Sequence, residues 1–213
     1  MNGSFSRART PAQRAARSDA ILAAARELVE GKPVSEISLR AIAVGAGLAP
    51  SSVLRHGGSR EQILLDLMDE EYGAWLTELK ADLRIEVTGE VADVVGVADT
   101  AAAIAFSLDR RPTLMVLIEN SPELLRHVST STRALNQGLR NQQELANIIE
   151  HAVGTELRPE DRPLLVAGLH ASVAGAAAWG RQSIFLSSPM EAIRDLLSIQ
   201  LDGLVVRALR GPE

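Results

Sequence analysis

The stretch SLRAIAVGAGLAPSSVLRHGG, residues 38–58, decides the fold of the N-terminal part of the chain. Ser38 can cap a short helix, and Gly47 can adopt the positive φ that a tight turn out of that helix requires. Pro50 suits the first position of a second short helix, which the Gly57-Gly58 pair ends. Two such helices form a helix-turn-helix, whose second helix enters the major groove of DNA. The same pattern also fits a surface turn between two packing helices.

Apolar periodicity predicts a longer helix on each side of this motif. Before it, apolar residues recur on one helical face from Ser18 until Gly31 and Pro33 stop the pattern. After it, Ser59 opens a capping box with Gln62, and the helical period continues to about Leu83. The second of these helices is long enough to connect two domains.

The remainder of the chain also reads as helical. Proline and glycine breaks beyond Gly89 mark about five more helices, and no alternating strand pattern is present. The predicted fold class is therefore all-α, with an N-terminal three-helix domain followed by a C-terminal helical bundle and about nine helices in total. Two late segments, Leu164 to Ser183 and Met190 to Leu209, carry small residues and a broad aliphatic stripe. They pack either within one chain or across a dimer interface.

Composition narrows the class of protein. Of the 213 residues, 46% are apolar but only 3% are aromatic, which predicts an aliphatic core. The chain has no cysteine, which excludes disulfides and thiolate chemistry. The first 20 residues contain charges and no apolar segment of a signal peptide, so a cytoplasmic location without membrane association is expected.

Charge is distributed unevenly along the chain. Residues 1–60 contain nine Lys and Arg against four Asp and Glu, whereas the whole chain has a net charge of -5. A basic N-terminal part joined to an acidic remainder fits a nucleic-acid-binding module attached to a body with another task. A basic tail without a specific partner would produce the same imbalance.

The motifs of common enzyme classes are missing from the sequence. It has no GxSxG, GxxxxGK, GxGxxG or HExxH motif, and its four histidines are scattered. An enzyme, a cofactor and a metal site are therefore not predicted.

The runs ILAAARELV (21–29) and VSEISLRAIAVGAGLAPSSVLRHGGSREQILLDLM (34–68) resemble the DNA-binding domain of TetR-family transcriptional regulators. The resemblance is strong over about residues 18–68. It implies a basic tail at 1–17, a DNA-binding domain at 18–60 with its motif at about 38–57, and a helical ligand-binding and dimerisation domain at 61–213. The implied function is that of a homodimeric repressor that leaves a palindromic DNA operator when an unknown small molecule binds.

Three residues depart from the family pattern. Ala49 replaces the usual capping Ser, Leu54 replaces a Tyr that contacts phosphate, and Gly57 replaces a Phe that wedges between helices. These departures keep an alternative open: a TetR-like module that binds a ligand or protein and has weakened or lost DNA binding.

Specific residues are assigned to each expected site. The expected DNA contacts are Ser38, Arg40, Pro50, Ser51, Ser52, Arg55, His56 and Arg60. Bulky or adaptable apolar residues of the body are the expected ligand contacts, although each also fits plain core: Trp75, Phe106, Met115, Leu117 and Trp179. The expected dimer interface consists of Leu165, Leu169, Val173, Ile193, Leu197, Leu201 and Leu204.

Overall fold

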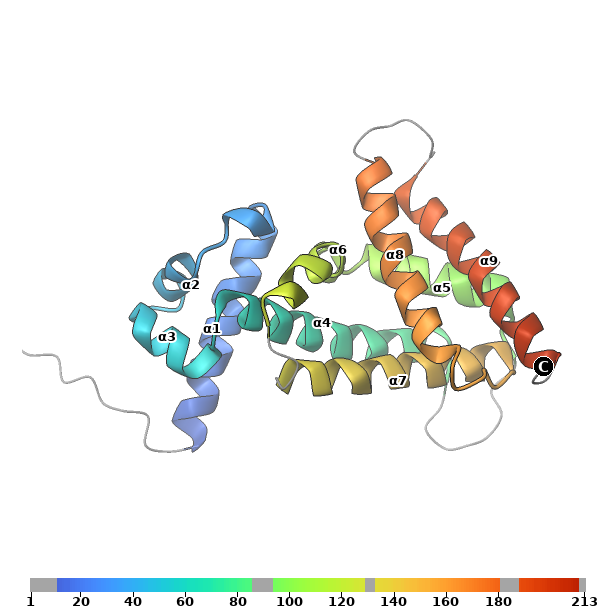
Figure 1. Ribbon diagram of the computed structural model, residues 1–213, viewed down its shortest axis with the longest axis horizontal. Coiled ribbons are helices and arrows are strands. Elements are labelled where there is room, and N and C mark those ends of the chain that lie inside the picture. Colours follow the sequence, from blue (N-terminus) through green and yellow to red (C-terminus); the bar gives the residue numbers. More distant parts are fainter. Residues whose placement is uncertain (1–10, 86–93, 129–132, 181–187, 211–213) are drawn as a thin grey trace, which may run out of the picture. The chain divides into compact units, whose positions relative to one another are not determined.

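The computed structural model describes residues 11–85, 94–128, 133–180 and 188–210. Within these ranges the protein is all-α, with nine α-helices, one short 3-10 helix and no strand (Figure 1). The predicted fold class is therefore confirmed. The elements are α1 (Pro11–Gly31), η1 (Val34–Glu36), α2 (Leu39–Gly45), α3 (Pro50–Gly57), α4 (Arg60–Asp82), α5 (Val97–Asp109), α6 (Pro112–Arg126), α7 (Arg133–Val153), α8 (Arg162–Gly180) and α9 (Pro189–Leu209).

The chain divides into two compact units. The first, here called the head, comprises Met1–Leu67 with Pro122–Val128, and the second, the body, comprises Met68–Ser121 with Ser129–Glu213. The division falls inside α4, later than the predicted boundary after residue 60. Helix α1 also begins at Pro11, so residues 11–17 are helical instead of forming part of a tail.

Helices α1, α2 and α3 pack against one another in the head. Ile21 and Ala25 of α1, Ile42 of α2 and Val53 of α3 are almost completely buried. At the contact of α1 with α2, a Cβ added to Gly45 would lie 3.0 Å from the Cβ of Ala24. Glycine therefore allows these two helices to approach closely.

The predicted helix ends are confirmed by backbone and capping geometry. The Ser38 hydroxyl accepts a hydrogen bond from the Ala41 amide at 3.1 Å, and Gly47 has a φ of 64°. Ala49 makes no side-chain cap, and Pro50 begins α3. Ser59 accepts from the Gln62 amide at 3.1 Å, whereas the Gln62 side chain donates to Asp66 instead of closing the capping box.

The core of the body is aliphatic, as the composition predicts, with one aromatic cluster. Trp75 of α4 is fully buried and meets Tyr72 edge-on, with 5.0 Å between ring centroids. Its indole Nε1 donates a hydrogen bond of 2.8 Å to Ser107 Oγ of α5. This bond satisfies the only polar atom of the largest buried side chain.

Helices α8 and α9 lie side by side in the body, and α9 also packs on α5 (Figure 1). The Gln200 side chain of α9 donates to the carbonyl oxygen of Leu164 at 2.8 Å, which ties the two helices together. No helix in the described ranges is long and apolar enough to cross a membrane.

The residues expected at the dimer interface lie inside the body core instead. None is more than 6% exposed: Leu165, Leu169, Val173, Ile193, Leu197, Leu201 and Leu204. They form the inward stripes of α8 and α9, so they cannot meet a second chain without unfolding this core. The aliphatic stripe that the sequence shows on these helices therefore packs within the chain.

The hydrogen bond between Trp75 and Ser107 generates a stability prediction. Ser107→Ala leaves the buried indole N–H without an acceptor, which we expect to lower the free energy of unfolding by about 1–3 kcal/mol. The double variant Trp75→Phe/Ser107→Ala removes the unpaired donor, so Ser107→Ala should cost less in the Trp75→Phe background. Thr77→Ala on the exposed face of α4 serves as the control. Equal costs of Ser107→Ala in both backgrounds, measured by urea unfolding, would contradict this role for the bond.

Candidate nucleic-acid interface

Helix α3 has one exposed face that does not pack against the core of the head. Pro50, Ser51, Leu54 and Arg55 are exposed, whereas Val53 is fully buried. Residues spaced by three and four positions lie on the same side of a helix, so Ser51, Leu54 and Arg55 form one surface. A hydroxyl, an apolar side chain and a guanidinium are thus available together to a DNA groove.

The start of α2 contributes a second exposed position. Arg40 is exposed one residue after Leu39, where α2 begins. Ser38 is also exposed, and its oxygen accepts from the Ala41 amide as the cap of α2. Its hydroxyl hydrogen can still be donated, and phosphate oxygens accept such bonds.

Two predicted contacts, Ser52 and His56, are only half exposed. The His56 ring faces α1, with its Nε2 3.4 Å from Nη1 of Arg17. His56 therefore lies at the contact between α3 and α1, beside the exposed face of α3.

Arg60, a predicted phosphate contact, makes its observed hydrogen bonds inside the head, and its role toward phosphate stays a prediction. Its guanidinium donates to the carbonyl oxygens of Val34, the first residue of η1, and Ile37, which directly follows η1. It also pairs with Glu61 at 2.9 Å. Its Nε, Nη1 and Nη2 atoms each take part in one of these interactions, so Arg60 joins the start of α4 to the segment that precedes α2.

The contact with Arg60 also affects the pKa of Glu61. Partial burial by itself would raise the pKa of this carboxyl group. Hydrogen bonds from its own backbone amide and from Arg60 more than offset that effect, and the pKa of Glu61 is lowered from its usual value. Glu61 therefore remains ionised and neutralises Arg60 at the N-terminus of α4, where a carboxylate is also favoured by the helix dipole.

The glycine at position 57 does not leave a hole in the head. A Cβ added to Gly57 would lie 3.0 Å from Cγ1 of Ile63 and 3.4 Å from Cγ2 of Ile21. Both isoleucines are 1% exposed and fill the space beside the glycine. The missing aromatic wedge is therefore replaced by packing of α1 and α4 against the end of α3.

The expected ligand residues differ widely in their exposure. Trp75 and Leu117 are fully buried, and Met115 is half-buried against the core. Phe106 and Trp179, by contrast, are 65% and 53% exposed. The Phe106 ring lies 4.7 Å from the Arg110 guanidinium, so a surface cation–π contact accounts for its position. The five residues therefore do not share one environment, and their role as ligand contacts stays a prediction.

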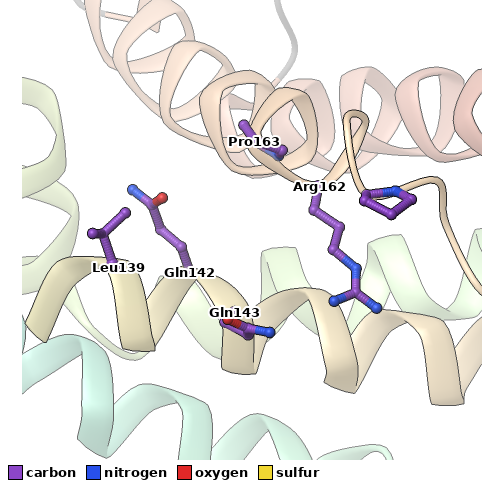
Figure 2. Close-up of a pocket in the computed structure, with 6 residues that line it drawn as sticks. Leu139, Gln142, Gln143, Arg162 and Pro163 are labelled. Atoms are coloured by element: carbon purple, nitrogen blue, oxygen red, sulfur yellow. The ribbon is translucent and has the colours of Figure 1, made fainter. Parts of the chain in front are cut away.

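A surface hollow of about 300 Å³ lies between α7 and the start of α8. Figure 2 shows Leu139 and Gln142 pointing from α7 toward the start of α8, from which Arg162 extends back toward α7. Gln143 and Pro163 also line the hollow. Arg162 is held by Glu150, with Nε–Oε1 and Nη2–Oε2 distances of 3.0 and 2.9 Å. None of the predicted ligand residues borders this hollow. No group of three or more acidic or histidine residues in the described part of the chain could hold a metal ion.

Two features of the head were not predicted from the sequence. The anchoring of Arg60 depends on backbone carbonyl oxygens, which have no sequence signature. The exposure of Leu54 could have been read from its spacing to Pro50, Ser51 and Arg55, all on one helical face.

Comparisons with known proteins agree with this geometry. The family profile described as "Bacterial regulatory proteins, tetR family" matches residues 21–67, close to the predicted 18–68. No curated protein matches the chain.

Solved structures share the fold at low sequence identity. A TetR transcriptional regulator from Rhodococcus sp. RHA1 superposes with a TM-score of 0.64 at 17% identity, covering 91% of this chain and 98% of that one. The fatty acid degradation regulator FadR from Bacillus halodurans has a TM-score of 0.54 at 14% identity, covering 93% and 98%. SmeT, the repressor of the Stenotrophomonas maltophilia multidrug efflux pump SmeDEF, has a TM-score of 0.51 at 19% identity, covering 90% of each chain.

The matched segment covers the second half of α1, all of α2 and α3 and the start of α4, which include the helix-turn-helix described above. The head therefore carries a segment that matches the tetR family of bacterial regulatory proteins, and the chain shares its fold with solved TetR regulators.

Proposed function

We propose that the protein is a homodimeric transcriptional repressor that binds a palindromic operator and leaves it when a small molecule binds the body. The observation that carries this proposal is the exposed face of α3, where Ser51 and Arg55 lie outside the head's packing contacts. Arg55 can pair with O6 and N7 of guanine in the major groove. Ser38 and Arg40 at the start of α2 are assigned to the phosphate backbone.

Charge supports the same assignment. The excess of basic residues in the first 60 positions attracts the DNA backbone, whereas the acidic remainder does not. Because Arg60 is neutralised within the head, fewer cations are available to phosphates than the sequence count implies. We therefore expect a salt dependence that is weaker than nine cations would produce.

The dimer is proposed to form through the outward faces of α8 and α9. On α9, exposed apolar residues lie opposite the buried stripe: Leu196, Ile199, Val206 and Leu209. On α8, the outward face carries Leu164, Ala167, Ala171 and Trp179. Exposed apolar residues on two neighbouring helices are typical of a protein interface, and small residues on α8 allow close helix packing. Twofold symmetry would then present two heads to two half-sites.

The effector is proposed to bind in the body near Tyr72 and His170. Tyr72 Oη and His170 Nε2 are buried and have no hydrogen-bond partner among the described residues, and their rings lie 5.9 Å apart. Buried polar atoms are rarely left unpaired, so a bound molecule could supply the partner. Burial lowers the pKa of His170 to about 4, which keeps its ring neutral at pH 7. An uncharged effector with hydrogen-bonding groups on an apolar skeleton fits these surroundings.

Coupling between effector and DNA is proposed to run through α4. This helix contributes Arg60–Leu67 to the head and Met68–Asp82 to the body, including Tyr72. An effector lowers operator affinity only by preferring the conformation that binds DNA poorly. A hundredfold decrease requires a coupling free energy of about 2.7 kcal/mol.

Substitution of Arg55 tests the DNA-binding role. Sequences enriched by the protein from a random duplex library supply the operator. Arg55→Ala should weaken binding to that operator by about 1–3 kcal/mol per half-site and relax preference at one base pair. Arg126→Ala, which removes another exposed arginine, on α6, that pairs with Glu123, should leave binding unchanged. Affinities are measured by fluorescence anisotropy at low and high salt. Failure of the protein to enrich any sequence would favour a TetR-like binding module without DNA recognition.

The two faces of α9 give a test of the dimer. Ile199 is 71% exposed, so Ile199→Glu should leave each chain folded but separate the dimer into monomers. Leu201 is fully buried, so Leu201→Glu should unfold the body because it places an unpaired charge in the core. Sedimentation at micromolar concentration reports the oligomeric state, and far-ultraviolet circular dichroism reports folding. A wild-type monomer, or a dimer that survives Ile199→Glu, would contradict this interface.

A further inference from the structure

Leu54 is an apolar side chain on the exposed face of α3, and it is 56% exposed. The packing of α3 onto the head is provided by Val53, which is fully buried, and by the contact of Gly57 with Ile21 and Ile63. Leu54 therefore contributes little to the stability of the head. A single exposed leucine is common on protein surfaces, so its meaning depends on its neighbours.

The neighbours of Leu54 are the groups assigned to DNA. Ser51 precedes it by three positions and Arg55 follows it directly, and both are exposed. The three side chains share one side of an eight-residue helix. A position suited to a base edge or a phosphate thus holds a side chain that neither donates nor accepts a hydrogen bond.

The major groove offers an apolar side chain one chemical group that it can contact favourably. Base edges there present hydrogen-bond donors and acceptors, together with the C5-methyl group of thymine. A leucine gains nothing from a phosphate or from a purine N7, but it removes its own apolar surface and that of a methyl group from water when the two touch. The neighbouring Arg55 matches guanine, whose O6 and N7 accept both of its donors.

We propose that Leu54 reads a thymine methyl group in each operator half-site, close to the guanine read by Arg55. The inference rests on the proposed DNA-binding function and adds a specificity-determining residue to it. Each operator half-site then contains a thymine whose methyl group, and not its hydrogen-bonding edge, is recognised.

Deoxyuridine substitution isolates this contact because it removes the methyl group and leaves base pairing intact. On an operator enriched from a random duplex library, each thymine is replaced in turn by deoxyuridine. One position per half-site should weaken wild-type binding about fourfold, and replacement in both half-sites should weaken it about fifteenfold. Leu54→Ala should bind the thymine and deoxyuridine operators equally well at that position.

Two controls separate this contact from general effects. Val44→Ala truncates another exposed apolar residue of the head, at the end of α2, and should retain the wild-type discrimination. Thermal unfolding should be nearly unchanged in Leu54→Ala, since the residue is exposed. If no deoxyuridine substitution weakens wild-type binding, or if Leu54→Ala still discriminates, the inference is wrong while DNA binding stands. If the wild-type protein enriches no sequence, the proposed function and this inference fail together.

Discussion

The arrangement of the head depends on two hydrogen bonds that the Arg60 guanidinium donates to the carbonyl oxygens of Val34 and Ile37. The segment from Val34 to Ile37 connects α1 to the capping residue of α2, and Arg60 is the first residue of α4. One side chain therefore fixes the route of the chain into α2 relative to the helix that follows α3. The helix-turn-helix, α2 and α3, lies in the chain between the Val34–Ile37 segment and Arg60. Glu61 keeps the partly buried charge of Arg60 neutralised.

This anchoring explains how the head accommodates its departures from the family pattern. With α4 held at its first residue, Ile63 reaches the space beside Gly57 and packs with Ile21. The head retains a closed core without an aromatic wedge, and α3 does not need Leu54 for its own packing. Leu54 is consequently free to lie on the exposed face with Ser51 and Arg55, where its chemistry affects DNA sequence preference.

The sequence predicted those features that depend on local chemistry. Ser38 as a cap, Gly47 at a positive φ and Pro50 at the start of α3 are each set by the backbone within a few residues, and all three are confirmed. The role of Arg60 could not be predicted, because its acceptors are backbone atoms more than 20 positions away. On α9 the pattern contains two apolar stripes. The richer stripe, with Leu197 and Leu201, packs inside the chain, and periodicity alone cannot show which stripe does so.

Hydrogen exchange on the free protein tests the anchoring role of Arg60 most directly. In Arg60→Met, the amides of Glu36, Ile37 and Ala41 should exchange about tenfold faster or more, because the segment before α2 loses charge-assisted hydrogen bonds. Amides of α7 should be unchanged, and Arg126→Met, which removes an exposed arginine, should have no effect on the head. Equal exchange of these three amides in the wild-type protein and Arg60→Met would contradict the account.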